Sequence, residues 1–357
     1  MIAFIFISIT LLGAAIYFVS LLLSVFFLAN QLGYIIILAS LLFISLGFLI
    51  ILSLSHFFNN LCLRIAYRFF SLAVGLLFYL TFFAIVCQIV KLIFPSIPLI
   101  ILAWISLFLA ISFFLIGLIE AFIPKIKNIS VKMANLPSNW QGKKIVQISD
   151  VHLGSICGVN FLKDKIIRIN ALNPDLVVIT GDLFDGTKDD ISIYIPELKK
   201  IKSKEGVFFV LGNHDLYLGA DKVKSVLNSA GINVLQNEAV IVDGLEIIGL
   251  SFQKSGNDES VVKNLSSKLA PCRLLLRHVP VGINWAKKMN IALQLSGHSH
   301  RGQMFPLAIL TWAIFGKYQY GLYTEGNFNI YTSSGLGSWG PPVRTFYQAE
   351  IVAITIN

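Results

Sequence analysis

Charge is almost absent from the first 122 positions, where the only charged residues are Arg64, Arg68, Lys91 and Glu120. A soluble domain needs a charged, hydrated surface, so this region cannot be an ordinary soluble domain. Each of its four apolar stretches has the ~20 residues that a helix needs to cross a bilayer. The stretches lie at about 2–29, 34–55, 69–90 and 98–122. We therefore predict a transmembrane region of about four helices over residues 1–122.

Two further absences narrow the class of protein. The first apolar stretch has neither a basic start nor a small-residue cleavage site, and more spans follow it, so we do not expect a removed signal peptide. The four cysteines show no C-x-x-C spacing, which argues against a disulfide framework and against a zinc-thiolate site.

The distribution of basic residues predicts the orientation of the chain. With four crossings, the loop at 56–68 and the C-terminal region share one side, and that side has more lysine and arginine than the loops at 30–33 and 91–97. Basic loops stay in the cytoplasm, so we expect a protein of the inner (plasma) membrane whose C-terminal domain is cytoplasmic. If the region had one span fewer, the C-terminal domain would lie on the opposite side of the membrane. The net charge of +9 suits anionic lipid headgroups, and no nucleic-acid partner is expected.

From residue 144 the pattern changes to short β-branched runs alternating with amphipathic stretches. Six runs predict buried strands: KIVQIS (144–149), DLVVIT (175–180), GVFFVL (206–211), LEIIGLS (245–251), RLLLRH (273–278) and IALQLS (291–296). Segments 161–172 and 221–230 suit helices. The sequence thus predicts an α/β domain with a layered sheet core over 144–357, preceded by a linker at 123–143.

Polar side chains follow five of these strands. They are Asp150 and His152, then Asp182, then Asn213, His214 and Asp215, then His278, and finally His298 and His300. Ligands collect beyond the carboxyl ends of strands in such sheets, so we expect these groups to meet at one rim. Their oxygens and imidazole nitrogens suit divalent Mn, Fe or Zn. Two such ions can bind a phosphate ester and activate water, which predicts a hydrolase.

The blocks DVH, GDLFD, GNHD, RH and GHSH together resemble those of the calcineurin-like metallophosphoesterase superfamily. The stretch YTSSGLGSWGPPVR (331–344) is similar to the membrane-anchored bacterial subgroup of that superfamily. The resemblance covers about 144–355 and implies a layered α/β/β/α sandwich. It also implies two divalent metal ions, with manganese favoured and iron, zinc or magnesium as alternatives.

The resemblance implies a role for each site residue. Asp150, His152 and His300 would hold one ion, Asn213, His278 and His298 the other, and Asp182 would bridge them. His214 would donate a proton to the leaving group or stabilise the transition state, and Asp215 would orient its imidazole and raise its pKa.

Three further positions bear on the substrate and on the roles of residues near the predicted ligands. The protein phosphatases of the superfamily have an arginine where this chain has Gly186, which disfavours protein dephosphorylation. Arg277 is a candidate contact for the substrate phosphate, with a surface charge as the alternative. Asp185 is either a partner of the ligands or a helix cap.

The apolar segment MFPLAILTWAIFG (304–316) directly follows the last candidate ligands. It is either a buried hairpin or a segment that dips into the bilayer surface beside the site. The second interpretation predicts a lipid bilayer partner and an amphiphilic phosphate substrate: a phosphodiester, phosphomonoester or diphosphate. Within the superfamily, UDP-diacylglucosamine is a concrete example. The alternative function is a catalytically weak metal-binding domain that regulates a membrane partner or transporter.

Overall fold

The computed structural model describes residues 19, 25, 31–252, 257–266 and 270–357. The chain forms two units. The helical unit comprises residues 1–119 and 340–345, and the α/β unit comprises residues 120–339 and 346–357.

The helices α2 (Gln31–Ser55), α3 (Leu61–Ile93) and α4 (Leu99–Phe122) are each long and apolar enough to cross a membrane. They correspond to three of the four predicted spans. The predicted stretch 2–29 lies outside the described residues except for positions 19 and 25, so the number of crossings and the sidedness stay predictions. Helix α3 begins where the Asn60 side chain accepts a hydrogen bond from the Leu63 N–H at 2.9 Å.

Part of the motif at 331–344 belongs to the helical unit. The Arg344 N–H donates to the Gly117 carbonyl of α4 at 2.8 Å, and the Thr345 hydroxyl donates to the Phe113 carbonyl at 3.2 Å. The Tyr79 hydroxyl of α3 donates to the Thr345 Oγ1. A segment near the C-terminus is therefore held by the helices that precede the α/β unit.

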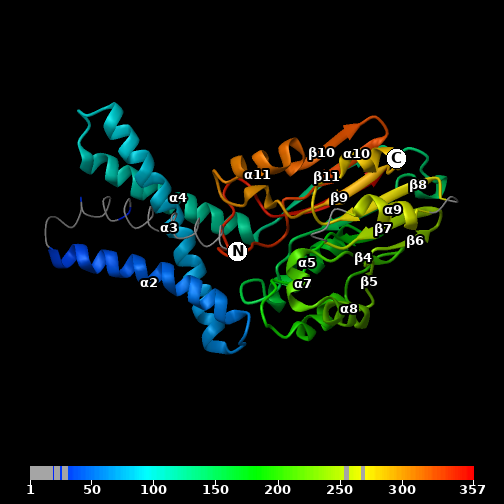
Figure 1. Cartoon of the computed structure of the whole chain (residues 1–357), viewed down its shortest axis with the longest axis horizontal. Helices are drawn as coiled ribbons and strands as arrows, with labels where there is room; N and C mark the ends of the chain where they lie inside the picture. The colour runs from blue at the N-terminus through cyan, green and yellow to red at the C-terminus, as the bar shows by residue number, and fades with distance from the viewer. Residues whose placement is uncertain (1–18, 20–24, 26–30, 253–256, 267–269) are drawn as a thin grey trace. The chain divides into compact units, whose positions relative to one another are not determined.

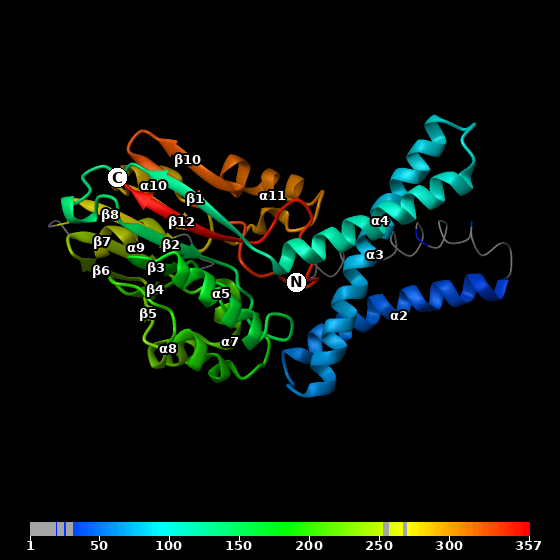
Figure 2. The same cartoon turned by 180° about the vertical axis from the view of Figure 1, so that it is seen from behind.

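The α/β unit contains two six-stranded sheets (Figures 1 and 2). The first has the order β1 (Lys125–Val131), β12 (Glu350–Ile356), β2 (Lys144–Ile148), β3 (Leu176–Ile179), β4 (Val207–Phe209), β5 (Asn233–Val234). The second has the order β10 (Gly321–Glu325), β11 (Phe328–Thr332), β9 (Leu293–Ser296), β8 (Cys272–Arg277), β7 (Leu245–Leu250), β6 (Glu238–Val242). Strands β2, β3 and β4 are mutually parallel, as are β7, β8 and β9, so their carboxyl ends lie at one edge of each sheet.

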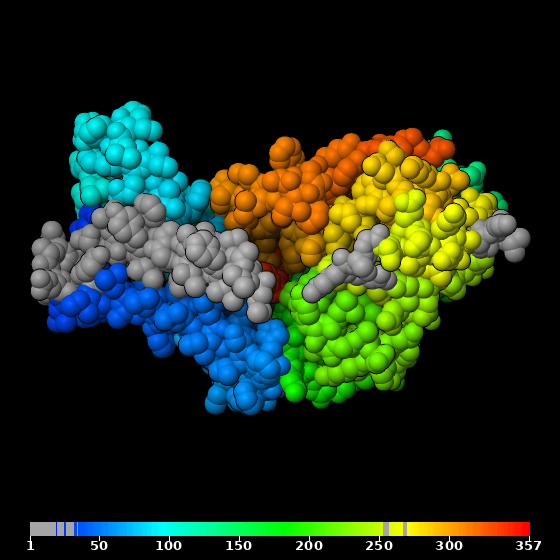
Figure 3. Space-filling model, viewed as in Figure 1, coloured from blue at the N-terminus to red at the C-terminus, as the bar shows by residue number. Residues whose placement is uncertain are grey.

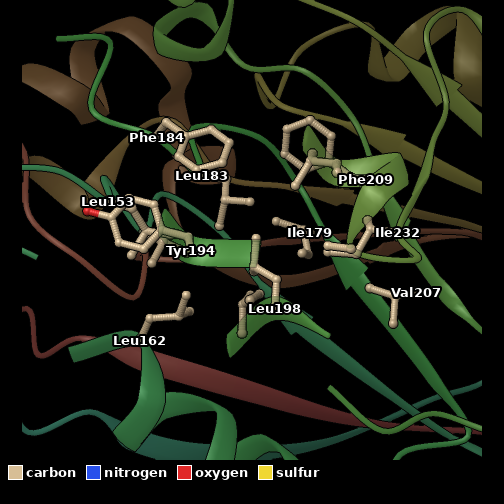
Figure 4. Packing of buried hydrophobic residues seen from close by; sticks show 14 of the residues in the cluster. Leu153, Leu162, Ile179, Leu183, Phe184, Tyr194, Leu198, Val207, Phe209 and Ile232 are labelled. Atoms are coloured by element: carbon tan, nitrogen blue, oxygen red, sulfur yellow. The ribbon is translucent and has the colours of Figure 1, made fainter. Parts of the chain in front are cut away.

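Among the described residues, three apolar clusters pack against the two sheets. One fills the space between the sheets, where Val178 of β3 and Leu274 of β8 are fully buried. The second packs α5 (Val159–Ala171) and α8 (Ala220–Ser229) on the outer face of the first sheet, and Figure 4 shows Ile179 and Phe209 in it. The third packs α9 (Asp258–Leu265) and α10 (Ile283–Lys288) on the second sheet. The predicted α/β/β/α sandwich is confirmed.

The six predicted strands are present, but the prediction of a linker at 123–143 is wrong. This segment contains β1, which pairs in parallel with β12 along seven residues. Its sequence KIKNISV alternates partly buried and exposed positions, as expected for an edge strand, and its polar content hid the strand. Only Ile123 and Pro124 separate α4 from β1.

The segment 304–316 is not a buried hairpin. It contains helix α11 (Ala308–Phe315), which has no buried residue (orange in Figures 1 and 3). Ile309, Leu310, Trp312 and Ile314 expose 60–71% of their surfaces. An apolar helix therefore lies on the surface of the α/β unit.

Candidate metal centre

The carboxyl ends of β2, β3, β8 and β9 bring six of the seven predicted ligands together in two groups, and the seventh, Asn213, follows β4. In the first group, His300 Nε2 lies 3.5 Å from Asp150 Oδ1 and 3.1 Å from His152 Nε2. Ligand atoms that converge in this way from two sheets can coordinate a single ion.

The second group is centred on His278. Its Nε2 lies 3.2 Å from Asp182 Oδ2 and 3.1 Å from His298 Nδ1. The same Asp182 oxygen lies 4.0 Å from His152 Nε2 of the first group. Asp182 thus stands between the groups, where a bridging carboxylate is needed.

Asn213 provides an independent test of fit. Its Oδ1 is buried and has no hydrogen-bond partner, which is costly in a folded protein unless another group satisfies the oxygen. Asp150 and Asp182 are also buried, at 0% and 2% exposure, and buried carboxylates require a counter-charge. The residues present therefore fit a pair of divalent ions.

The backbone at this rim is strained. Five of the seven proposed ligands have positive φ: Asp150 (51°), His152 (50°), Asp182 (49°), His298 (70°) and His300 (47°). This region costs a non-glycine residue on the order of 1–3 kcal/mol and is most often occupied at functional sites. The positive φ values thus occur at residues whose side chains converge on the site.

Two motif glycines allow close approach of the backbone to the ligands. A Cβ on Gly212 of GNHD would overlap Oδ1 of Asp182, and a Cβ on Gly297 of GHSH would overlap Oδ2 of Asp150. Any larger residue would displace a proposed ligand. The close approach of the backbone to these two carboxylates thus explains why glycine occupies both positions.

Backbone groups orient the ligands. The Nδ1–H of His278 donates to the Thr180 carbonyl at 2.8 Å, which leaves Nε2 directed at Asp182. The Asp182 Oδ1 accepts the His214 N–H at 2.8 Å, and Asp150 accepts the His298 N–H at 3.0 Å. Such contacts around a site fix which ligand atoms face the metal.

The ionisable side chains of the site shift one another's pKa values. Burial opposes ionisation of Asp182, but the charges of His278 and His152 hold the pKa of this carboxyl well below its usual range. Burial likewise opposes protonation of His278, yet Asp182 raises the pKa of that ring to about 10. Burial and the neighbouring His278 lower the pKa of His298 to about 4, so its ring is neutral near pH 7 and can bind a metal.

His214 is oriented by a different group from the one predicted. Its Nδ1 donates to the Asp185 carbonyl at 2.8 Å. The Asp215 carboxylate instead accepts the Gly212 N–H at 2.9 Å and the Phe184 N–H at 3.1 Å, because Asp215 lies in the first turn of α7 (Asn213–Leu218) and turns back toward the helix start. The predicted rise in pKa is also wrong: burial and the His152 charge lower the pKa of His214.

Asp185 is a partner of the ligands, the first of the two alternatives. Its Oδ1 lies 3.3 Å from His152 Nδ1, which is an ion-pair distance to the ring of a proposed ligand when that ring is protonated. Asp185, His152 and His214 also form a group close enough to hold an ion.

Arg277 is already paired in the α/β unit. Its guanidinium contacts the Asp258 carboxylate and the Val281 carbonyl. A role in substrate binding would require it to break this pair, and that role stays a prediction.

Two side chains beside the site, those of Arg301 and Trp339, were not predicted from the sequence. Arg301 directly follows His300, and its guanidinium carbon lies 4.3 Å from the centre of the Tyr320 ring. The ring of Trp339 lies 5.9 Å from that of His214. The arginine could have been found from its position next to a ligand, and Trp339 from its place in the motif at 331–344.

Together, the sandwich and its rim of carboxylate, amide and imidazole groups define a class: layered α/β/β/α proteins with a candidate dinuclear metal centre. A family model described as calcineurin-like phosphoesterase matches residues 143–302. The uncharacterized metallophosphoesterase YkuE of Bacillus subtilis is 34% identical over 241 residues, which are 64% of this chain and 84% of that protein. The chain belongs to the calcineurin-like phosphoesterase family.

Two further relatives are similar. An uncharacterized metallophosphoesterase of Campylobacter jejuni is 34% identical over 242 residues, 66% of this chain and 63% of that protein. A transmembrane protein with metallophosphoesterase domain from Danio rerio is 32% identical over 253 residues, 66% of this chain and 57% of that protein. The chain thus spans less than two thirds of either relative. The Danio rerio protein and the three apolar helices both support association with a membrane.

Proposed function

We propose that this protein is a membrane-anchored, metal-dependent phosphoester hydrolase that acts on amphiphilic phosphates at the membrane surface, on the cytoplasmic side of the inner membrane. The observation that supports the amphiphilic substrate is the position of α11. Its last residue, Phe315, has its ring centre 6.0 Å from that of His298, a proposed ligand. An exposed apolar helix thus adjoins the metal centre.

The length and composition of α11 suit the membrane interface. Eight residues rise about 12 Å, too short to cross the ~30 Å of hydrocarbon, so the helix would lie in the surface. Burying an isoleucine or leucine is worth about 1.5–3 kcal/mol, so Ile309, Leu310 and Ile314 together favour insertion by several kcal/mol. Only two residues connect α4, which would cross the membrane, to β1 of the α/β unit.

The residues of the chain have separate tasks in hydrolysis. Asp150, His152, His300, Asn213, His278, His298 and Asp182 would hold two divalent ions, for which manganese is the favoured identity. When bound, the ions supply positive charge against the phosphoryl oxygens and activate water. The Nδ1–H of His214 is fixed on the Asp185 carbonyl, so its Nε2 is the atom that delivers a proton to the departing oxygen.

The experiment compares substrates with and without a lipid portion. The full chain in nanodiscs with Mn²⁺ is expected to have a higher kcat/KM for an amphiphilic phosphodiester or diphosphate, such as UDP-diacylglucosamine, than for its soluble headgroup analogue. The double substitution Leu310→Ser with Ile314→Ser should reduce this preference, since both side chains are exposed on α11. Ile241→Ser, at an exposed position of β6, is the matched control. Equal kcat/KM for the two substrates in the wild type would remove the lipid proposal while leaving the hydrolase.

A further inference from the structure

A pocket of about 340 Å³ lies beside α11 in the α/β unit. Its lining residues are Arg301, Ala308, Ile309, Trp312, Gln319 and Tyr347. We propose that this pocket binds the anionic headgroup of a lipid, with Arg301 as the residue that recognises the negative charge. The inference deepens the proposed function, on which it rests, because it names the chemistry by which the enzyme would select an amphiphile.

Arg301 is positioned to bind an anion. Its guanidinium carbon lies 4.3 Å from the centre of the Tyr320 ring and 5.0 Å from that of Tyr347, so two aromatic rings hold it. Within the part of the chain that the structure describes, no carboxylate oxygen lies within 4.0 Å of this guanidinium. Its planar donors are therefore available for the bidentate contacts that arginine makes with phosphate.

The carboxylate of Glu350, near Tyr320, is hydrogen-bonded to groups other than Arg301. Glu350 accepts hydrogen bonds from the Tyr331 hydroxyl at 2.9 Å, from the Ser334 N–H at 2.9 Å and from the Tyr320 hydroxyl at 3.1 Å. Tyr320 thus connects Glu350 on its hydroxyl to Arg301 on its ring face. The carboxylate is satisfied without an ion pair to Arg301, which leaves a positive charge at the pocket.

Apolar side chains of α11 also line the pocket. Ala308, Ile309 and Trp312 come from α11, and the Thr311 hydroxyl of that helix donates to the Gln319 side chain. The Ser299 hydroxyl contacts the Gln319 carbonyl, and the Ser299 Oγ accepts the Arg301 N–H at 3.1 Å. The pocket therefore combines a cation with apolar side chains, which are the two features that bind an anionic amphiphile.

The pocket is also close to the metal centre. His300 and Arg301 are consecutive, so their Cα atoms are ~3.8 Å apart. Their side chains reach different partners: His300 faces Asp150, whereas Arg301 faces Tyr320. A lipid with two anionic groups is the substrate class that would place its reacting phosphate at the metals and its second anionic group at Arg301.

The test is photocrosslinking in nanodiscs, which reports binding without any need for turnover. The full chain is reconstituted with Mn²⁺ and a trace of diazirine-bearing phosphatidylglycerol in phosphatidylcholine, and crosslinks are mapped by mass spectrometry. The control lipid is phosphatidylcholine with the same diazirine chain. We expect residues 301–319 to be labelled by the anionic probe and Arg301→Gln to reduce that labelling roughly tenfold at sub-saturating probe, since a charge-assisted contact is lost. Arg168→Gln on α5 is the matched control, because Arg168 pairs with Asp164 outside the pocket.

The possible outcomes distinguish the proposal for the pocket from the proposal that the protein is a hydrolase. Equal labelling by the two probes, or labelling that Arg301→Gln leaves unchanged, would overturn the Arg301 site even if the protein hydrolyses bis-p-nitrophenyl phosphate. Loss of labelling in Arg301→Gln, in a protein that hydrolyses no phosphodiester, would support the pocket and contradict the proposed function.

Discussion

Replacement of His214 by alanine separates catalysis from metal binding. The imidazole is not among the seven proposed ligands, and the His214 N–H that donates to Asp182 at 2.8 Å belongs to the backbone and survives the substitution. The Asp185 carbonyl at 2.8 Å and the Tyr217 ring at 5.3 Å hold the imidazole in one orientation, as an efficient acid requires. Losing a positioned general acid lowers kcat about 10²–10⁴-fold. That loss corresponds to roughly 3–5 kcal/mol in the activation barrier.

The assay is Mn²⁺-dependent hydrolysis of bis-p-nitrophenyl phosphate, with metal content measured on the same samples. Burial and His152 lower the pKa of His214 below its ordinary 6.5, and the acid acts in its protonated form. The kcat of the wild type should therefore fall as pH rises through that pKa, and the fall should be absent in His214→Ala. Asp182→Ala is the comparison variant, which should lose metal as well as activity. A His214→Ala protein with wild-type kcat and an unchanged pH profile would refute the reasoning.

Three further predictions follow from the site and the core. Gly212→Ala should abolish metal binding, because its Cβ would overlap the Asp182 carboxylate; metal analysis that finds full occupancy would contradict this. Metal affinity should rise with pH, by at most about tenfold per pH unit for each proton displaced, because Asp182 raises the pKa of His278 to about 10 and the ion must displace that proton. Calorimetry in buffers of different ionisation enthalpy checks this, and the absence of proton release would oppose it. Phe209→Ala should lower the free energy of unfolding by about 3–5 kcal/mol, since its ring is fully buried. Denaturant titration should show a much smaller loss for the exposed Ile167→Ala, and equal losses would contradict the packing.

The strands that end in proposed ligands could be predicted because both of their faces are buried. Runs such as LVVI in β3 are continuously apolar, and the polar residue that follows marks the sheet edge. The edge strands β1 and β6 were missed because alternating polar and apolar residues there look like a linker or a surface turn. Pairing with β12, over 200 residues away in the sequence, makes β1 a strand.

Contacts between side chains were less predictable than the positions of the ligands. The sequence places Asp215 beside His214, but the start of α7 turns that carboxylate toward Gly212 and Phe184. Arg277 precedes a proposed ligand, yet the fold pairs it with Asp258. In each case a tertiary partner, rather than the neighbouring residue, decides where the charged group points.

Seven side chains from two sheets are proposed to bind two divalent ions. The most direct test is anomalous diffraction from crystals of the Mn²⁺-loaded full chain. We predict two manganese peaks ~3.5–4 Å apart, with an Asp182 oxygen between them and the Asn213 Oδ1 coordinated to one. A single peak, or metal bound away from these residues, would contradict the account.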